Sequence, residues 1–132
     1  MPYYIGDVIK DYKKLVIRTP EDFKKSGVDV KIKTRVEGID PKKGRVSLSD
    51  GTALPYDILV MATGAEAARL GLPGEDMEGV FFFRKLTDGL KMKAFLDSKP
   101  CRKAVIIGAG YIGMEMCEAF RTLGIETQVN VG

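Results

Sequence analysis

Residues 108–113 carry three glycines at the spacing Gly-x-Gly-x-x-Gly, directly after the apolar run Ala104–Ile107. A buried strand, this spacing and a following amphipathic helix form a loop whose main-chain N–H groups bind the pyrophosphate of a dinucleotide. Gly108 permits the tight turn, Gly110 lets the main chain approach the phosphates, and Gly113 lets the helix pack closely on the strand. The sequence therefore predicts a dinucleotide-binding loop.

The segments around these glycines have the patterns of a strand, a helix and a second strand. The apolar residues of Lys103–Ile107 follow one another without alternation, which predicts a strand covered on both faces. From Tyr111 to Leu123, apolar residues recur at helical spacing, and Gly124 provides a C-terminal stop. Glu126–Val131 can supply a second, parallel strand. The predicted apolar face of the helix comprises Ile112, Met116, Ala119, Phe120 and Leu123.

One part of the dinucleotide-binding pattern is absent. About 20 residues after the glycines, the second strand normally ends in Asp or Glu, which accepts hydrogen bonds from the adenine ribose. Here the sequence reads Gln128–Gly132, with neither that acid nor the following arginine typical of NADP sites. The sequence leaves the choice between NAD and NADP open and predicts weak affinity through this half-site alone.

Composition restricts the function classes. The 132 residues are 45% hydrophobic and 30% charged, which is typical of a soluble globular protein. The net charge of +3 is too small, and the lysines too dispersed, to indicate nucleic-acid binding. No apolar run approaches the length of a membrane span and no signal-peptide pattern begins the chain, so we expect a cytoplasmic protein.

The sequence predicts no metal site. Cys101 and Cys117 are the only cysteines, and their separation fits neither a CxxC redox pair nor a metal knuckle. The chain contains no histidine. A histidine-based acid, base or metal ligand is therefore excluded from these residues.

Two further helices are predicted from their ends. Thr19 as N-cap and Pro20 at the first helical position begin a short helix that Gly27 ends. Thr87 can cap a helix that ends near Lys99.

Alternating apolar residues predict an antiparallel three-stranded β-meander. Its strands cover residues 28–36, 46–48 and 53–54, and the turns at Asp40–Gly44 and Asp50–Gly51 separate them. Ile58–Ala62 is a continuous apolar run, which predicts a strand buried on both faces. The fold class is α/β, with a Rossmann-like βαβ unit and this meander.

In this order, the motifs resemble those of the flavin-dependent pyridine nucleotide–disulfide oxidoreductases, particularly the branch of coenzyme A-disulfide reductases and NADH oxidases. The resemblance implies FAD and NAD(P)H as cofactors and partial FAD- and NAD(P)-binding domains. The matching segments are Pro2–Gly6, Arg18–Glu21, Leu54–Asp57 leading into Ala62–Gly64, and Val105–Glu115.

The resemblance divides the chain into three parts. Residues 1–70 would be the C-terminal part of an FAD-binding domain with its β-meander. Residues 71–100 would be a connector and a helix. Residues 101–132 would be the first βαβ unit of an NAD(P)-binding domain, which is truncated.

The resemblance also implies residues near the flavin. Ala62, Thr63 and Gly64 match the turn that ends the FAD domain beside that cofactor. The backbone at Val36 would face the FAD adenine. A plain core position in a strand explains Val36 equally well.

For the nicotinamide, the resemblance implies three residues of the glycine-rich segment. Tyr111 and Ile112 would lie near the ring, and Glu115 on the next turn would help to hold it. Tyr111 can also be read as a partly exposed aromatic residue, and a surface role explains Glu115 equally well.

The sequence lacks parts that the family has. In this branch, a redox cysteine and a glycine-rich FAD unit precede the Pro-Tyr-Tyr segment, and a dimerisation domain follows the nicotinamide domain. We therefore expect the middle piece of a longer enzyme, inactive by itself, with no catalytic residue of its own. Exposed sheet edges predict a homo-oligomer.

Two function classes remain. The first is a fragment of an FAD-dependent NAD(P)H oxidoreductase, in which a hydride passes from NAD(P)H to FAD and then electrons pass to a disulfide or oxygen. The second is a non-catalytic dinucleotide-binding or assembly module.

Overall fold

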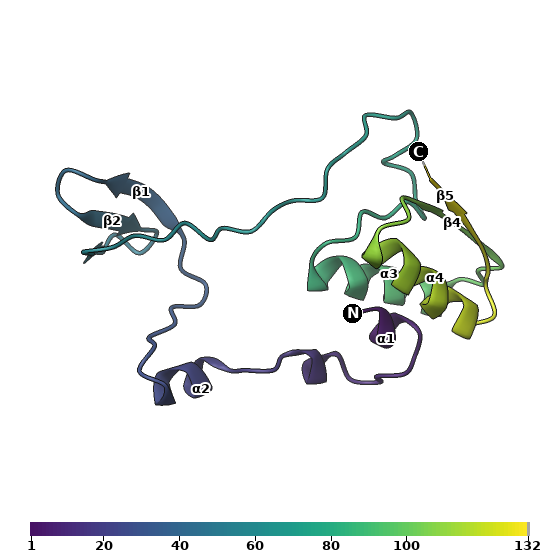
Figure 1. Ribbon diagram of the computed structural model, residues 1–132, viewed down its shortest axis with the longest axis horizontal. Coiled ribbons are helices and arrows are strands. Elements are labelled where there is room, and N and C mark those ends of the chain that lie inside the picture. The colour runs from purple at the N-terminus through teal and green to yellow at the C-terminus, as the bar shows by residue number, and fades with distance from the viewer. Residues whose placement is uncertain (132) are drawn as a thin grey trace. The chain divides into compact units, whose positions relative to one another are not determined.

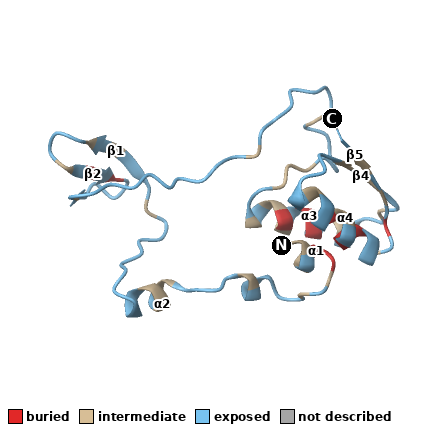
Figure 2. Ribbon diagram, in the orientation of Figure 1, coloured by how far each residue is buried: buried red, intermediate tan, exposed pale blue. Residues whose placement is uncertain are grey.

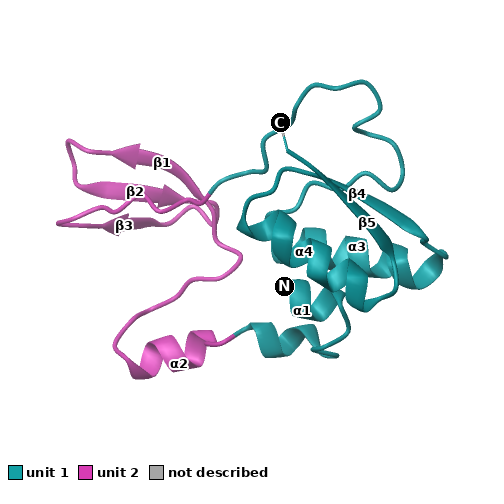
Figure 3. Cartoon of the chain, turned by 45° about the vertical axis from the view of Figure 1, so that its right-hand side comes forward, with its two compact units in different colours: residues 1–16, 65–132 teal, residues 17–64 magenta. Residues whose placement is uncertain are grey.

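The computed structural model describes residues 1–131, which fall into two units coloured separately in Figure 3. The α/β unit comprises residues 1–16 and the chain from residue 65 onward, and the meander unit comprises residues 17–64. The longest helix in this described part has 13 residues, and no helix there combines the length and apolar character of a bilayer span. The elements are α1 (Pro2–Ile5), the 3₁₀ helix η1 (Tyr12–Leu15), α2 (Pro20–Lys25), β1 (Val36–Asp40), β2 (Arg45–Leu48), β3 (Ala53–Pro55), α3 (Leu86–Ser98), β4 (Lys103–Ile107), α4 (Tyr111–Thr122) and β5 (Glu126–Asn130).

A βαβ unit forms the sheet of the α/β unit. β4 and β5 pair in parallel, from Lys103 opposite Glu126 to Ile107 opposite Asn130, and α4 connects them and packs on both (Figure 1). Gly124 follows the end of α4 in the left-handed region, with φ of 75°, which stops the helix. The predicted strand, helix and parallel strand are confirmed.

The core of the α/β unit lies where α1, α3 and α4 meet, as the red segments of Figure 2 show. Ile5 of α1 is fully buried, at 0% exposed. A Cβ added to Gly6 would lie 3.2 Å from the Cα of Ala119, so α1 packs directly on the backbone of α4. The buried cluster consists of Ile5, Met92, Met116, Ala119, Phe120 and Ile125.

The prediction that β4 is covered on both faces is wrong. Val105 is 62% exposed and Ile107 is 68% exposed, whereas Ala104 and Ile106 pack against the core. α4 packs on the two-stranded sheet, and the side chains of Val105 and Ile107 are left exposed. Ile112, predicted on the apolar face of α4, is also exposed because it lies in the first turn, before the helix reaches the core.

The N-cap of α3 lies two residues earlier than predicted. The N-cap is Lys85, not Thr87. The carboxylate of Asp88 accepts hydrogen bonds from the N–H groups of Arg84 and Lys85, at 3.0 and 2.7 Å. The N–H of Lys85 is the main cause that lowers the pKa of Asp88. A carboxylate that reaches back from the first turn therefore sets the start of the helix.

The meander unit contains an antiparallel sheet in the order β1-β2-β3, as predicted. Its first strand begins later than expected, because residues 28–35 form no strand and β1 starts at Val36. Ile39 and Leu54 are paired with Val46 on either side, and this register buries Val46 and Leu48. The two buried side chains of β2 are enough to cover one face of this short ladder. Val28, Val30 and Ile32, which were expected in the first strand, are exposed and have no partner strand in this unit.

The predicted strand at Ile58–Ala62 is absent, since these residues have no regular structure. Ile58 is 84% exposed, and Val60 and Met61 are also exposed. A strand forms only when neighbouring strands satisfy its backbone groups, and β3 is followed by no further strand in residues 17–64. An apolar run alone therefore does not fix a strand here.

Candidate functional site

The loop between β4 and α4 has the backbone geometry that its glycines predict. Gly108 adopts φ of 103°, a conformation that side chains disfavour. Its N–H donates to the carbonyl of Asn130 at 2.9 Å, which extends the β4–β5 ladder by one bond. Gly108 thus turns the chain sharply at the carboxyl end of the parallel sheet, where ligands bind in such folds.

Gly113 makes the closest approach between α4 and the loop. A Cβ added to Gly113 would overlap the carbonyl oxygen of Gly108 and would lie 3.3 Å from Cγ2 of Ile106. Only a residue without a side chain permits this contact. The role predicted for the third glycine, close packing of the helix on the strand, agrees with this geometry.

Gly110 leaves open space in front of the helix. It is the N-cap of α4, and a Cβ added there would meet no atom within 4 Å. It offers no side chain to cap the helix, and the first turn of α4 carries no acidic residue. The N–H groups of the first turn have no partner inside the helix, and they lie at its positive end. A diphosphate therefore fits in front of Gly110 in both charge and space.

The residues predicted near the nicotinamide lie along the first two turns of α4. Tyr111 is 94% exposed, and Ile112 is exposed beside it. Glu115 is one turn further along on the side of Tyr111, because residues four apart share a helix face. Glu115 lines a shallow groove between α4 and α1, together with Tyr3 and Gly6.

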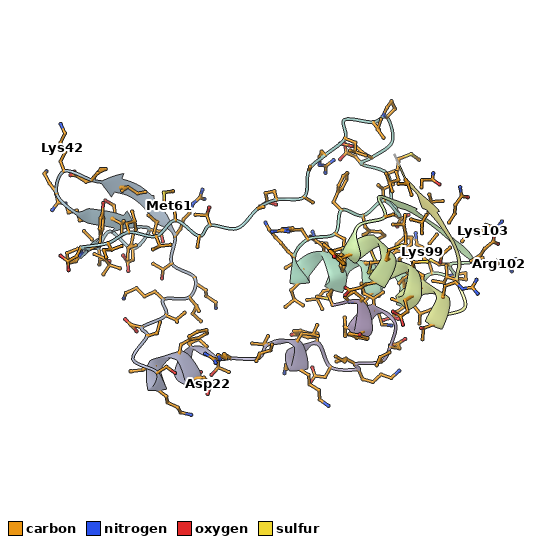
Figure 4. The ribbon with its side chains drawn as sticks, in the orientation of Figure 1. Asp22, Lys42, Met61, Lys99, Arg102 and Lys103 are labelled. Atoms are coloured by element: carbon orange, nitrogen blue, oxygen red, sulfur yellow. The ribbon has the colours of Figure 1, made fainter. Side chains whose placement is uncertain are left out.

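The residues predicted near the flavin lie in the meander unit. Ala62, Thr63 and Gly64 belong to an exposed segment without regular structure, and Met61 before them is labelled in Figure 4. Gly64 has φ of 74° and open space around it. That these residues contact a flavin stays a prediction.

Val36 is the first residue of β1. It pairs with Leu48, and a β-bulge separates this pair from the next one at Gly38. The side chain of Val36 is exposed, so the core position considered from the sequence does not describe it. The exposed backbone edge beside a bulge is a place where a ligand can approach.

Sequence patterns did not reveal Lys93, which is buried on α3. Its ammonium forms ion pairs with Asp97 and, at 3.3 Å, with Asp7 after α1. Burial alone would lower the pKa of Lys93, but the hydrogen bonds to Asp97 and Asp7 outweigh it and raise the pKa. The spacing of Lys93 and Asp97 is readable as a helical pair, whereas Asp7 is distant in sequence. Lys93 thus holds α1 against α3.

Groups suited to metals or thiol chemistry are sparse. Cys101 and Cys117 are free thiols and half-buried. Within residues 1–131, no three His, Cys, Asp or Glu side chains come together in a way that could hold a metal ion.

Comparison with known proteins gives a consistent family. The sequence pattern of the family described as "Pyridine nucleotide-disulphide oxidoreductase" matches residues 3–131. An NADH oxidase of Methanocaldococcus jannaschii is 33% identical in an alignment of 134 residues. The alignment covers 98% of this chain and 30% of that protein. A coenzyme A disulfide reductase of Staphylococcus haemolyticus is 30% identical over 96% of this chain and 29% of its own length.

Solved structures agree with these relatives. Reduced CoADR-RHD of Bacillus anthracis matches with a TM-score of 0.85 and 32% identity, over 98% of this chain and 25% of that one. The water-forming NADH oxidase of Lactobacillus brevis bound to NADH matches with a TM-score of 0.80 and 30% identity, over 98% of this chain and 30% of that one. The chain thus spans about 30% of the length of the curated relatives named above.

Proposed function

Because the chain belongs to the pyridine nucleotide–disulphide oxidoreductase family, we propose that it is the part of an FAD-dependent NAD(P)H oxidoreductase that binds the pyridine nucleotide. In the whole enzyme a hydride would pass from NAD(P)H to FAD, and electrons would then pass to a disulfide or oxygen. Residues 101–132 would begin the NAD(P)-binding domain, residues 71–100 would connect, and residues 1–70 would end the FAD-binding domain.

The open space in front of Gly110, at the N-terminus of α4, is the observation that carries this proposal. Gly108 turns the chain, Gly113 brings α4 close, and Gly110 leaves room for phosphate oxygens. The N–H groups of the first turn of α4 would hold the pyrophosphate, with Tyr111 and Ile112 beside the nicotinamide and Glu115 next to them. When bound, NAD(P)H supplies the hydride, and these residues bind and orient it.

The names of the relatives support two classes of electron acceptor. NADH oxidases act on oxygen in the water-forming case, and coenzyme A disulfide reductases act on a disulfide. For this chain the acceptor is therefore proposed only as one of these two classes. The isolated chain is proposed to be inactive and cytoplasmic, as expected from the sequence.

The flavin part of the proposal concerns the meander unit. Ala62, Thr63, Gly64 and the backbone of Val36 would contact FAD when other parts of the enzyme complete the site. Family membership supports this assignment, and the exposed state of these residues leaves their surfaces available. A flavin absorbance band in the purified chain would show that residues 1–132 suffice for binding, and a colourless preparation would show that they do not.

The alternative function is that of a non-catalytic assembly module. The exposed apolar residues support this alternative. Ile58 and Val60 of the meander unit, and Val105 and Ile107 of the α/β unit, are uncovered. Two or more copies of the chain would bury them by packing these apolar surfaces together and by pairing at sheet edges. Light scattering of the purified chain tests this, since a homo-oligomer is expected and a monomer that unfolds cooperatively would contradict it.

Calorimetric titration with NADH tests the main proposal. We expect weak binding in the millimolar range to the full chain and its loss in Gly110→Ala, because the added methyl group occupies the phosphate space. Gly38→Ala is the matched control, since a Cβ there makes only ordinary contacts of 3.8 Å with Ser47. Absence of binding to the wild-type chain, or equal binding by Gly110→Ala, would contradict the proposal.

A further inference from the structure

A groove on the α/β unit lies between α1 and α4, beside the residues proposed to meet the nicotinamide. Glu115 and Glu118 of α4 line one side, and Tyr3, Gly6 and Val8 line the other. Glu115 therefore belongs both to this groove and to the proposed nicotinamide site. The position of α1 sets the width of the space that faces Glu115.

The apolar contacts of α1 press it onto its neighbours. Ile5 is fully buried, and Gly6 lies so close to α4 that an added Cβ would be 3.2 Å from the Cα of Ala119. Apolar burial acts in no particular direction. A directional contact is therefore needed to fix the path of the chain where it leaves α1.

The chain turns sharply at Asp7, directly after α1. Asp7 adopts φ of 61°, in the left-handed region that Asp tolerates better than most residues. The N–H of Ile9 then donates to the carbonyl of Tyr3 at 2.9 Å, so the chain folds back over α1. Gly6 and Val8, the two neighbours of Asp7, both line the groove. The conformation of Asp7 thus determines how this side of the groove faces α4.

Lys93 of α3 holds Asp7 in place. Lys93 is only 8% exposed, and its ammonium lies 3.3 Å from the carboxylate of Asp7. It also pairs with Asp97 on its own helix. Lys10 is 3.7 Å from Asp7, but its side chain is 80% exposed and contributes little. A buried ammonium without its carboxylate partners is costly, so the contact with Asp7 ties α3 to the groove.

We propose that Lys93 is a positioning residue for the nicotinamide half of the dinucleotide site. Through Asp7 it fixes the α1 side of the groove, which faces Glu115, and it does so without touching the dinucleotide. This inference rests on the proposed function, because it concerns the same bound dinucleotide. The contacts of the loop at Gly108–Gly113 involve β4, β5 and α4, so the diphosphate half of the ligand should not depend on Lys93.

The test compares the two halves of the ligand, reduced nicotinamide mononucleotide and ADP, in NMR titrations of the full chain. Asp7→Asn keeps a residue that tolerates the left-handed region but removes the negative charge. Its affinity for the nicotinamide mononucleotide should fall about fivefold or more, whereas its affinity for ADP should stay within about twofold of wild type. Lys93→Met should show the same pattern. Lys93→Arg, which keeps the positive charge, should recover most of the lost affinity.

Asp97→Asn is the matched control. It removes the other carboxylate partner of Lys93 but leaves the contact with Asp7. Asp97→Asn and Asp7→Asn should therefore lower the melting temperature to a similar degree, and only Asp7→Asn should change the ratio of the two affinities. A purely structural role of Lys93 would give the same ratio in both variants.

The outcomes separate this inference from the proposed function. If Asp7→Asn leaves the ratio unchanged, or changes it no more than Asp97→Asn does, the positioning role is overturned while the diphosphate loop stands. If the wild-type chain binds ADP but not the nicotinamide mononucleotide, the positioning role is also overturned, because the groove then does not face the nicotinamide. If neither compound binds, the proposed function itself fails.

Discussion

The α/β unit and the meander unit differ in how much apolar surface each covers by itself. Six apolar residues, from α1, α3, α4 and the position before β5, form one buried cluster in the α/β unit. In the meander unit only Val46 and Leu48 are buried, and Ile58 is almost fully exposed. The dinucleotide loop is thus held by a core of its own unit, whereas the segment assigned to the flavin is not.

The two proposed cofactor sites therefore differ in how many other parts of the protein each one needs. The loop at Gly108–Gly113 needs only β4, β5 and α4, all of which pack on the core of their unit. The segment Ala62–Gly64 has a suitable sequence but is exposed and has no regular structure. We therefore expect dinucleotide binding to survive in this chain and flavin binding to need further partners.

The largest expected effect on stability comes from a substitution in the core of the α/β unit. Ile5→Ala should lower the free energy of unfolding by about 2–5 kcal/mol, because it leaves a cavity at a fully buried position. Ile58→Ala removes the same groups from an exposed position of the meander unit and should cost less than about 0.5 kcal/mol. Urea unfolding followed by circular dichroism measures both. Equal costs would mean that the two units do not differ in this way.

Gly113→Ala should have the next largest effect. The new methyl group would overlap the carbonyl of Gly108, and relief of this overlap should cost about 1–3 kcal/mol. Gly110→Ala, with no atom within 4 Å of the new methyl group, should cost less than about 1 kcal/mol. Thermal unfolding compares the two. A larger loss for Gly110→Ala would show that the helix is not packed as described.

Lys93→Met tests the contact that joins α1 to α3 and should cost about 1 kcal/mol at neutral pH. The folded-state pKa of Lys93 lies above its ordinary value of 10.5, so its contribution is present below pH 10.5 and is lost as pH rises through the raised value. The difference in unfolding free energy between wild type and variant should therefore be constant from neutral pH to about pH 9 and shrink above about pH 10.5. A difference that grows at high pH would contradict this assignment.

Thr19→Ala should have the smallest effect on overall stability. Thr19 and Asp22 form a capping box at the start of α2, whose loss costs about 1 kcal/mol of local helix stability. No residue of α2 is buried, so this local loss should leave the unfolding of the α/β unit unchanged. Far-ultraviolet circular dichroism should show slightly less helix at an unchanged melting temperature. A shift in that temperature would show that α2 is coupled to the core.

Sequence patterns predicted the elements whose stabilising contacts are local. Glycine spacing and helical periodicity gave the βαβ unit, and turn residues gave the meander. The strand at Ile58–Ala62 failed because its pairing depends on strands that the meander unit does not provide. Thr87 failed as a cap because Asp88 reaches the N–H groups of Arg84 and Lys85 instead.

Sequence patterns also could not predict the long-range contacts of α1. Nothing in Pro2–Ile5 indicates that Ile5 would enter a core built from residues about 90–120 positions away. The pairing of Lys93 with Asp7 has the same character, since it depends on where α1 packs. For the candidate site, the three glycines were readable because each performs a backbone role, whereas the exposure of Val36 and Ile112 depends on tertiary neighbours.

The most direct test of the central claim is a two-dimensional NMR titration of the full chain with ADP, which contains the diphosphate without nicotinamide. The predicted result is that the largest amide shifts fall on Gly108–Gly113 and that they disappear in Gly110→Ala. Shifts spread over the meander unit, or none in the loop at millimolar ADP, would contradict the claim that this loop binds a diphosphate.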